Sequence, residues 1–292
     1  MTAGRAERPE RSGGLDSARA ATRRPRYTRW RRVSQLAVAA FFVLLPFAGS
    51  TRIAGSLVAL ATGPVDLVEP ASALSAALAA HALPRSLLVA VVPLLALALV
   101  LGPVYCSWAC PFGLTSELVD RSLRRERRWV GRPSASARRT RIAALLALLG
   151  ASLLLGVPLA ALIAPPRLAT VLPLELRAAG AVSLVTAALL MGVVALELAG
   201  PRRVICRALC PAGAVAALLR VRATLAPRLD QTRCRCPDVA PCFQACPWGI
   251  DPRSMRPRDG CTTCLVCVER CPSQALSVSF RRSQLNAHPE ER

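Results

Sequence analysis

The sequence predicts an α-helical membrane protein with four transmembrane helices, arranged as two repeated hairpins, followed by a small C-terminal α+β domain. Three observations lead to this fold class. Four apolar stretches contain no charged residue and are long enough to span a bilayer, which takes about 20 apolar residues in a helix. A ten-residue cysteine motif occurs twice, and eight of the twelve cysteines fall in one short C-terminal segment.

The four predicted spans are Val33–Thr51, Ser86–Tyr105, Ile142–Pro166 and Ala178–Leu196. Two shorter apolar runs, residues 53–65 and 71–84, flank Asp66 and Glu69, and at that length we expect interfacial or re-entrant segments. The chain of 292 residues combines 53% hydrophobic content with a net charge of +21. That combination is unusual for a soluble domain and typical of a membrane protein with basic cytoplasmic loops.

The distribution of arginine predicts the orientation of the spans. The N-terminal tail and the loop from Arg121 to Arg141 are rich in arginine, whereas the two segments on the other side hold two arginines each. We therefore expect a multi-pass protein of the cytoplasmic (inner) membrane, with both termini and the C-terminal domain in the cytoplasm. The tail has no aromatic residues interleaved beyond Tyr27 and Trp30, so no nucleic acid partner is expected.

The duplicated motif lies at the cytoplasmic end of each predicted hairpin. Residues 104–113 and 204–213 align without gaps and share C-x-x-x-C-P-x-G, with the core motifs at 106–111 and 206–211. If the hairpins pack as pseudo-symmetric partners, the four thiols would converge and could hold an additional cluster or another metal, or act as redox thiols. The four cysteines are Cys106, Cys110, Cys206 and Cys210. The alternative is that cysteine suits a small apolar helix end, with Pro111 and Pro211 ending the helices.

The strongest signal is a run of four cysteines near the C-terminus. Cys261, Cys264, Cys267 and Cys271, the last followed by Pro272, form the C-x-x-C-x-x-C-x-x-x-C-P run of bacterial ferredoxins. In that run three thiolates bind one 4Fe–4S cluster and the fourth reaches a second cluster. A zinc site would instead favour two separated pairs of cysteines.

A second set of cysteines lies upstream: Cys234, Cys236, Cys242 and Cys246. Crossed ligation predicts that the first three join Cys271 on one cluster, and that Cys246 joins Cys261, Cys264 and Cys267 on the other. The C-x-C spacing at the start departs from the usual run. The ligand set of the first cluster therefore stays open, as does the alternative of a single degenerate cluster.

These segments predict a division into four parts. Residues 1–32 are expected to be a basic, disordered cytoplasmic tail, and residues 33–220 a transmembrane domain that includes both C-x-x-x-C-P motifs. Residues 230–280 are expected to form a ferredoxin-like domain with two 4Fe–4S clusters, and residues 281–292 a tail.

With these residues in place, the chain resembles the NapH/MauN group of ferredoxin-type membrane proteins. The resemblance runs from the sequence Trp30-Arg-Arg-Val-Ser-Gln35 to about Phe280 and rests on the duplicated C-x-x-x-C-P blocks followed by the paired cluster motifs. It implies an electron-transfer subunit of the quinol dehydrogenase type, which oxidises membrane quinol and passes electrons towards periplasmic oxidoreductases or supports their maturation. The neighbouring CcoG-type proteins carry an extra C-terminal domain, whereas this chain stops soon after its second cluster motif.

The leading hypothesis is a membrane-anchored iron–sulfur protein that relays electrons. It would work between the quinone pool, or a cytoplasmic donor, and a partner oxidoreductase or ferredoxin-type subunit. Two alternatives stay open: an assembly factor that reduces a metal or disulfide for a respiratory or periplasmic enzyme, and a membrane redox sensor. No residue is assigned a catalytic role. Glu197, at the end of the last predicted span, is expected to reach water.

Overall fold

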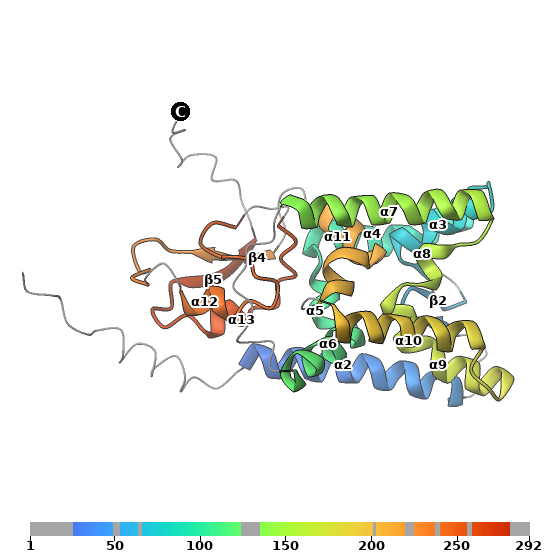
Figure 1. The fold of residues 1–292 in the computed structure, drawn as a ribbon, viewed down its shortest axis with the longest axis horizontal. Helices are drawn as coiled ribbons and strands as arrows, with labels where there is room; N and C mark the ends of the chain where they lie inside the picture. Colours follow the sequence, from blue (N-terminus) through green and yellow to red (C-terminus); the bar gives the residue numbers. More distant parts are fainter. Residues whose placement is uncertain are drawn as a thin grey trace, which may run out of the picture.

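The structure is a computed structural model, and it describes residues 26–48, 53–63, 66–123, 135–200, 203–219, 225–236, 240–255 and 259–280. Residues 1–25 of the tail expected at 1–32, and the tail expected at 281–292, lie outside these ranges. Figure 1 shows a bundle of long helices with a small domain, rich in cysteine, at one end.

Four long helices run along the bundle, and each holds the central part of one predicted span. They are α2 (Arg26–Leu44), α4 (Arg85–Leu101), α7 (Ala135–Leu155) and α10 (Leu184–Ala199). Two shorter helices complete the bundle. Helix α3 (Pro70–Ala79) packs against α7, and helix α9 (Pro165–Ala179) packs against α2 and α10.

The prediction of one continuous helix over residues 142–166 is wrong. Helix α7 ends at Leu155, where Gly156 adopts a left-handed φ of +64°. Pro158 follows, and its ring and missing N–H prevent the helix from continuing. The chain then forms the short helix α8 (Leu159–Leu162) before α9 begins.

Other predicted boundaries are also wrong. Helix α4 ends at Leu101 because Gly102 has a φ of +69°, so Tyr105 belongs to the next helix, α5 (Val104–Trp108). Helix α10 begins at Leu184, after Ser183 caps it by accepting the N–H of Thr186. Helix α2 begins at Arg26, so the expected boundary between tail and membrane domain after residue 32 falls inside a helix. It ends in a 3₁₀ turn, η1 (Leu45–Phe47).

By length and composition, one helical stretch in the described residues could cross a membrane by itself: Arg26–Phe47. Three further helices are apolar but shorter, namely α3, α4 and α10. The count of four transmembrane helices therefore stays a prediction.

Residues 53–63 of the apolar run at 53–65 contain two strands instead of a helix. Strands β1 (Ala54–Ser56), β2 (Ala59–Ala61) and β3 (Leu67–Val68) make a small antiparallel sheet in that order. The turn between β1 and β2 is held among the helices, because the N–H of Leu57 donates to Thr170 Oγ1 at 3.0 Å and its carbonyl accepts from the Tyr105 hydroxyl at 3.2 Å. Non-helical backbone inside a bundle needs such internal partners.

The C-terminal domain is α+β, as the ferredoxin-like prediction requires. Strand β4 (Leu225–Leu229) pairs antiparallel with β5 (Leu276–Phe280), and the short helices α12 (Pro241–Gln244) and α13 (Val266–Glu269) lie beside them. Because β4 completes this sheet, the domain begins by Leu225 and not at residue 230. At the junction with the bundle lie α5, α6 (Pro111–Ser122), η3 (Ile205–Leu209) and α11 (Pro211–Leu219).

Candidate metal centres

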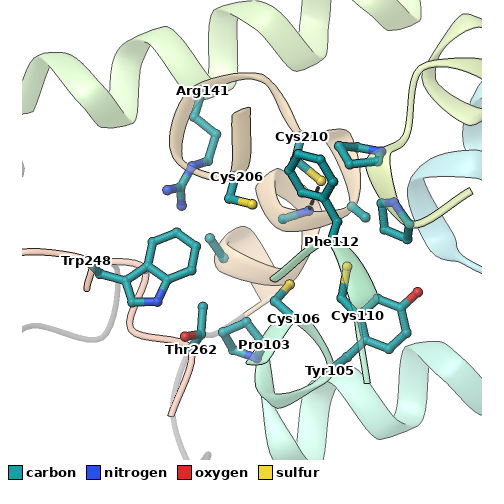
Figure 2. Close-up of a pocket in the computed structure, with 16 residues that line it drawn as sticks. Pro103, Tyr105, Cys106, Cys110, Phe112, Arg141, Cys206, Cys210, Trp248 and Thr262 are labelled. Carbon is teal, nitrogen blue, oxygen red and sulfur yellow. Dashed lines mark hydrogen bonds between the residues drawn. The ribbon is translucent and has the colours of Figure 1, made fainter. Parts of the chain in front are cut away.

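Four thiols from the duplicated motif meet in one pocket, which we call the motif pocket: Cys106, Cys110, Cys206 and Cys210. Cys106 lies on α5 and Cys206 in η3, while Cys110 and Cys210 precede the first residues of α6 and α11. Figure 2 shows all four sulfur atoms facing the same space, between elements that are about one hundred residues apart in the sequence. The convergence predicted for the two hairpins is therefore what the structure shows.

The two motifs fold in the same way, although neither continues as a single helix. The N–H of Cys110 donates to the carbonyl of Tyr105 at 3.1 Å, and the N–H of Cys210 donates to the carbonyl of Ile205 at 2.8 Å. Both bonds join residues five apart, the pattern of a π turn, which often marks functional sites. The wide turn places the second cysteine of each motif at the start of a new helix.

The proline and glycine of the motif support this arrangement. Pro111 and Pro211 occupy the first position of α6 and α11, where a missing N–H costs nothing. The N–H of Gly213 donates to Cys210 Sγ at 3.5 Å. A side chain at Gly113 would place its Cβ 3.1 Å from the carbonyl oxygen of Cys106 and 2.9 Å from Gln35 Nε2. Helix N-termini of this kind favour negative charge on the thiols.

Arg141 of α7 is the cation of the motif pocket. It lines the pocket beside the four thiols, and its Nε donates to the carbonyl of Arg207 at 2.8 Å. Its guanidinium reaches Gly260, where an added Cβ would lie 2.8 Å from Nη1. Among the described residues Arg141 has no carboxylate partner. A cation in an apolar pocket calls for an anionic neighbour, and thiolates can serve as one.

A second pocket, the inner pocket, lies in the C-terminal domain and is lined by Cys246, Cys261, Cys264 and Cys267. Backbone amides point at its sulfur atoms: the N–H of Ile250 donates to Cys246 Sγ at 3.4 Å, and that of Thr263 to Cys261 Sγ at 3.5 Å. The loop reaches this shape because Thr263 and Leu265 adopt left-handed φ values of +53° and +61°.

The remaining four cysteines form the outer group: Cys234, Cys236, Cys242 and Cys271. Cys242 and Cys271 are buried, and the two cysteines of the C-x-C sequence pack against them half-buried. Burial raises the pKa of the Cys242 thiol to about 11, and it raises that of Cys246 in the inner pocket to about 12. A metal that binds these thiols must displace their protons.

Crossed ligation predicts these two sets, and the structure brings together each of them. Cys246 comes from the upstream motif but lies with Cys261, Cys264 and Cys267, whereas Cys271 lies with the upstream cysteines. All twelve predicted site residues thus fall into three sets of four, and all are free thiols.

Within the described residues, no group of three or more His, Cys, Asp or Glu is arranged to hold a single metal ion. In a mononuclear zinc site each thiolate lies about 2.3 Å from the ion, so the sulfur atoms crowd together. A four-iron cluster is larger and keeps its cysteines further apart. The C-x-x-C-x-x-C-x-x-x-C-P spacing of the C-terminal run is the one that binds 4Fe–4S clusters.

The C-terminal domain is held against the bundle through the cluster loop. Ser107 of α5 donates to Thr262 Oγ1 at 2.5 Å, and Trp108 Nε1 donates to the carbonyl of Thr263 at 3.1 Å. On the other side, the N–H of Thr28 donates to Glu269 Oε1 at 2.9 Å. Residues inside the two kinds of cysteine motif thus touch each other.

Several buried polar residues near these sites were not predicted from the sequence. Arg31 and Arg32 of α2 both pair with Glu117 of α6, and Arg203 Nε lies 2.9 Å from Asp120 Oδ2. Arg31 and Arg32 lie in the Trp30–Gln35 sequence where the family resemblance begins, and the other charged residues flank the duplicated motifs. Gln35 is fully buried, and its Nε2 donates to the carbonyl of Cys110 at 3.1 Å.

The expectation that Glu197 reaches water is wrong. Its side chain is 2% exposed, and its Oε2 accepts the N–H of Ile205 at 3.3 Å. The carboxylate satisfies an amide at the start of η3 that has no partner within the turn.

Comparison with known proteins agrees with this chemistry. A protein family described as "4Fe-4S binding domain" matches residues 83–130 and 182–226, and each segment contains one C-x-x-x-C-P-x-G motif. A "Ferredoxin" from Methanothermococcus thermolithotrophicus is 36% identical over 55 residues, which is 17% of this chain and 92% of that protein. No solved structure matches. The cysteine sets, the α+β domain and this similarity together show that the chain belongs to the ferredoxin-type iron–sulfur proteins.

Proposed function

We propose that this protein is a membrane-embedded electron carrier with three cluster sites, one in each set of four cysteines. A bound 4Fe–4S cluster accepts and releases one electron at a time, at a potential set by net charge, burial and hydrogen bonds to its sulfur atoms. The chain would supply the thiolate ligands, the backbone amides that donate to sulfur, and the arginines that balance negative charge.

One observation carries the proposal: the three sets of cysteines form a continuous row. Trp248 lines both the motif pocket and the inner pocket. Cys267 of the inner pocket packs in the same cluster of buried side chains as Cys242 and Cys271 of the outer group. Because electron transfer weakens steeply with distance, sites in contact suit a relay.

The motif pocket is the new element in this row. Two observations support a cluster there beyond the four thiols. Both segments that match the 4Fe–4S binding family contain the motif, and Arg141 presents a half-buried cation without a carboxylate partner among the described residues. A cluster held by four thiolates is an anion and would balance this charge.

The outer surfaces of the helices support membrane embedding. Large apolar side chains are exposed along all four long helices, and Leu154 of α7 and Leu184 of α10 are each 84% exposed. A soluble protein rarely exposes so much apolar surface. Helix α4 has 17 residues and spans about 25 Å at 1.5 Å per residue, close to the thickness of a bilayer core.

The arrangement of the helix ends supports the predicted orientation. The start of α2, the end of α4, the start of α7 and the end of α10 all lie at the end of the bundle that adjoins the C-terminal domain (Figure 1). A cytoplasmic domain would then sit directly at the inner surface of the membrane. A quinol in the bilayer, or a soluble cytoplasmic donor, would exchange electrons with this row, and a quinol would release two protons to water for the two electrons that it delivers.

Burial disfavours the assembly-factor alternative in its thiol-exchange form. Disulfide exchange requires a thiolate to reach the sulfur atom of a partner. Cys110 and Cys210 are 7% and 8% exposed, Cys106 and Cys206 are half-buried, and Trp248, Thr262 and Gly260 of the C-terminal domain line the same pocket. Ligation of a resident cluster requires no such access.

The test is iron and acid-labile sulfide content, together with EPR of the dithionite-reduced protein purified without oxygen. We expect about twelve irons per chain, and about eight in a Cys106→Ala/Cys206→Ala variant. About eight irons in both proteins would mean that the motif pocket binds no cluster and that the relay consists of the two clusters of the C-terminal domain. Zinc in place of iron, with about four irons or fewer, would refute the electron-transfer function.

A further inference from the structure

Trp248 occupies a special place between two of the cluster sites. It is the one described residue that lines both the motif pocket and the inner pocket. Its side chain is only 7% exposed. Figure 2 shows the indole at the edge of the motif pocket, beside Thr262 and on the side where Cys106 and Cys206 lie.

The indole N–H has no hydrogen-bond partner among the described residues, although Nε1 is fully buried. A buried donor without an acceptor costs about 1–3 kcal/mol, so native structures rarely leave one. The donor belongs to a side chain that lines the pocket of the four thiols. The natural acceptor is a sulfur atom of a group bound between them.

Contacts with Arg203 and Asp120 hold the indole ring in place. Arg203 lies over the ring with Cζ 5.9 Å from the ring centroid, a cation–π contact. Arg203 is itself held by Asp120 through the 2.9 Å contact, and both side chains are buried. This support from α6 limits the rotation of the ring.

The segment that contains Trp248 also lines the inner pocket. Two residues on, the N–H of Ile250 donates to Cys246 Sγ in the inner pocket at 3.4 Å. The segment from Trp248 to Ile250 thus lies against the motif pocket and the inner pocket. Hydrogen bonds to cluster sulfur raise the potential, because they favour the more negative, reduced form.

We propose that Trp248 couples the cluster of the motif pocket to that of the inner pocket. Its indole N–H donates to a sulfur atom of the group in the motif pocket, and its ring fills the contact through which the electron passes. In that step one cluster loses one electron and the other gains it, and no bond or proton is exchanged. The proposal rests on the third cluster proposed above.

The test uses two variants of the intact protein. Trp248→Phe keeps an aromatic ring but removes the N–H, whereas Trp248→Leu removes both. Trp30→Phe is the control, because Trp30 is 62% exposed on α2. Each protein is titrated potentiometrically with EPR detection, and the motif-pocket signal is identified by its absence in the Cys106→Ala/Cys206→Ala variant.

In Trp248→Phe we expect unchanged iron content and a lower potential for the motif-pocket cluster alone. The equilibrium constant for reduction of this cluster should fall by up to about tenfold, which corresponds to a potential lower by about 59 mV for one electron. Trp248→Leu should show the same shift and, in addition, several-fold slower electron exchange between the two clusters after rapid photoreduction. Trp30→Phe should match the unmodified protein in both measurements.

An unchanged motif-pocket potential in Trp248→Phe, with about twelve irons retained, would overturn the proposal and leave the three-cluster relay standing. About eight irons in the unmodified protein would instead remove the third cluster, on which the proposal rests. If Trp248→Phe lost clusters, pulsed EPR of the unmodified protein labelled with ¹⁵N in indole would decide. A ¹⁵N coupling to the motif-pocket cluster supports the hydrogen bond, and its absence refutes it.

Discussion

The hydroxyl of Ser107 donates to the hydroxyl oxygen of Thr262 at 2.5 Å, and both side chains are only 3% exposed. Ser107 stands between Cys106 and Cys110 of the duplicated motif, and Thr262 stands between Cys261 and Cys264 of the cluster loop. The contact therefore fixes the motif pocket against the inner pocket. Docking of the domain and alignment of the cluster sites depend on the same residues.

Replacement of Ser107 by Ala should weaken this docking. The Thr262 hydroxyl would lose its buried donor, which costs about 1–2 kcal/mol. We expect a lower thermal midpoint in detergent and faster proteolytic release of the C-terminal domain. A double variant, Ser107→Ala/Thr262→Val, should lose less than the sum of the two single changes, because no unpaired hydroxyl is left. Fully additive losses would mean that the two hydroxyls do not interact.

The two motif glycines should differ in their tolerance of a side chain. A Cβ at Gly113 would lie 2.9 Å from Gln35 Nε2, whereas at Gly213 the closest atom is the carbonyl oxygen of Cys206 at 3.4 Å. Gly113→Ala should therefore cost about 1–3 kcal/mol through overpacking and lower the iron content of the motif pocket. Gly213→Ala should keep its iron. Equal effects of the two substitutions would contradict the packing seen around Gln35.

The sequence was informative where chemistry repeats at a fixed spacing. The motifs at 106–111 and 206–211 predicted converging thiols, and crossed ligation predicted which cysteines of the C-terminal domain lie together. In both patterns the spacing of the cysteines determines which thiols can lie on the same side of a turn or loop. The C-terminal α+β domain followed from the same cysteine spacing.

Hydropathy was less informative about where helices end. Gly156 and Pro158 break the third predicted span without changing its apolar character, so the prediction joined two helices. Arg141, Arg203 and Trp248 belong to no motif and meet only through tertiary packing. The position of Trp248, shortly after Cys246 and Pro247, was the only local hint that it lines both pockets.

Arg141 should tune the cluster of the motif pocket. Arg141→Met removes the positive charge that favours the reduced, more negative cluster, so the potential should fall. The expected loss is about 1–2 kcal/mol, or roughly tenfold in the reduction equilibrium. Arg139→Met is the matched control, because Arg139 lies on the same helix but is exposed. Equal potentials in the two variants, by EPR-detected titration, would show that Arg141 acts only in packing against Gly260.

Crossed ligation can be tested by pairing cysteine substitutions. If Cys246 shares a cluster with Cys261, then Cys246→Ser/Cys261→Ser should lose about four irons, no more than either single variant loses. Cys246→Ser/Cys234→Ser should lose about eight irons, because the two residues serve different sites. Sequential ligation predicts the reverse, since Cys234 and Cys246 would then share one cluster. Iron analysis of the two double variants therefore separates the arrangements, even if serine retains part of a cluster, because the comparison depends only on which pair is additive.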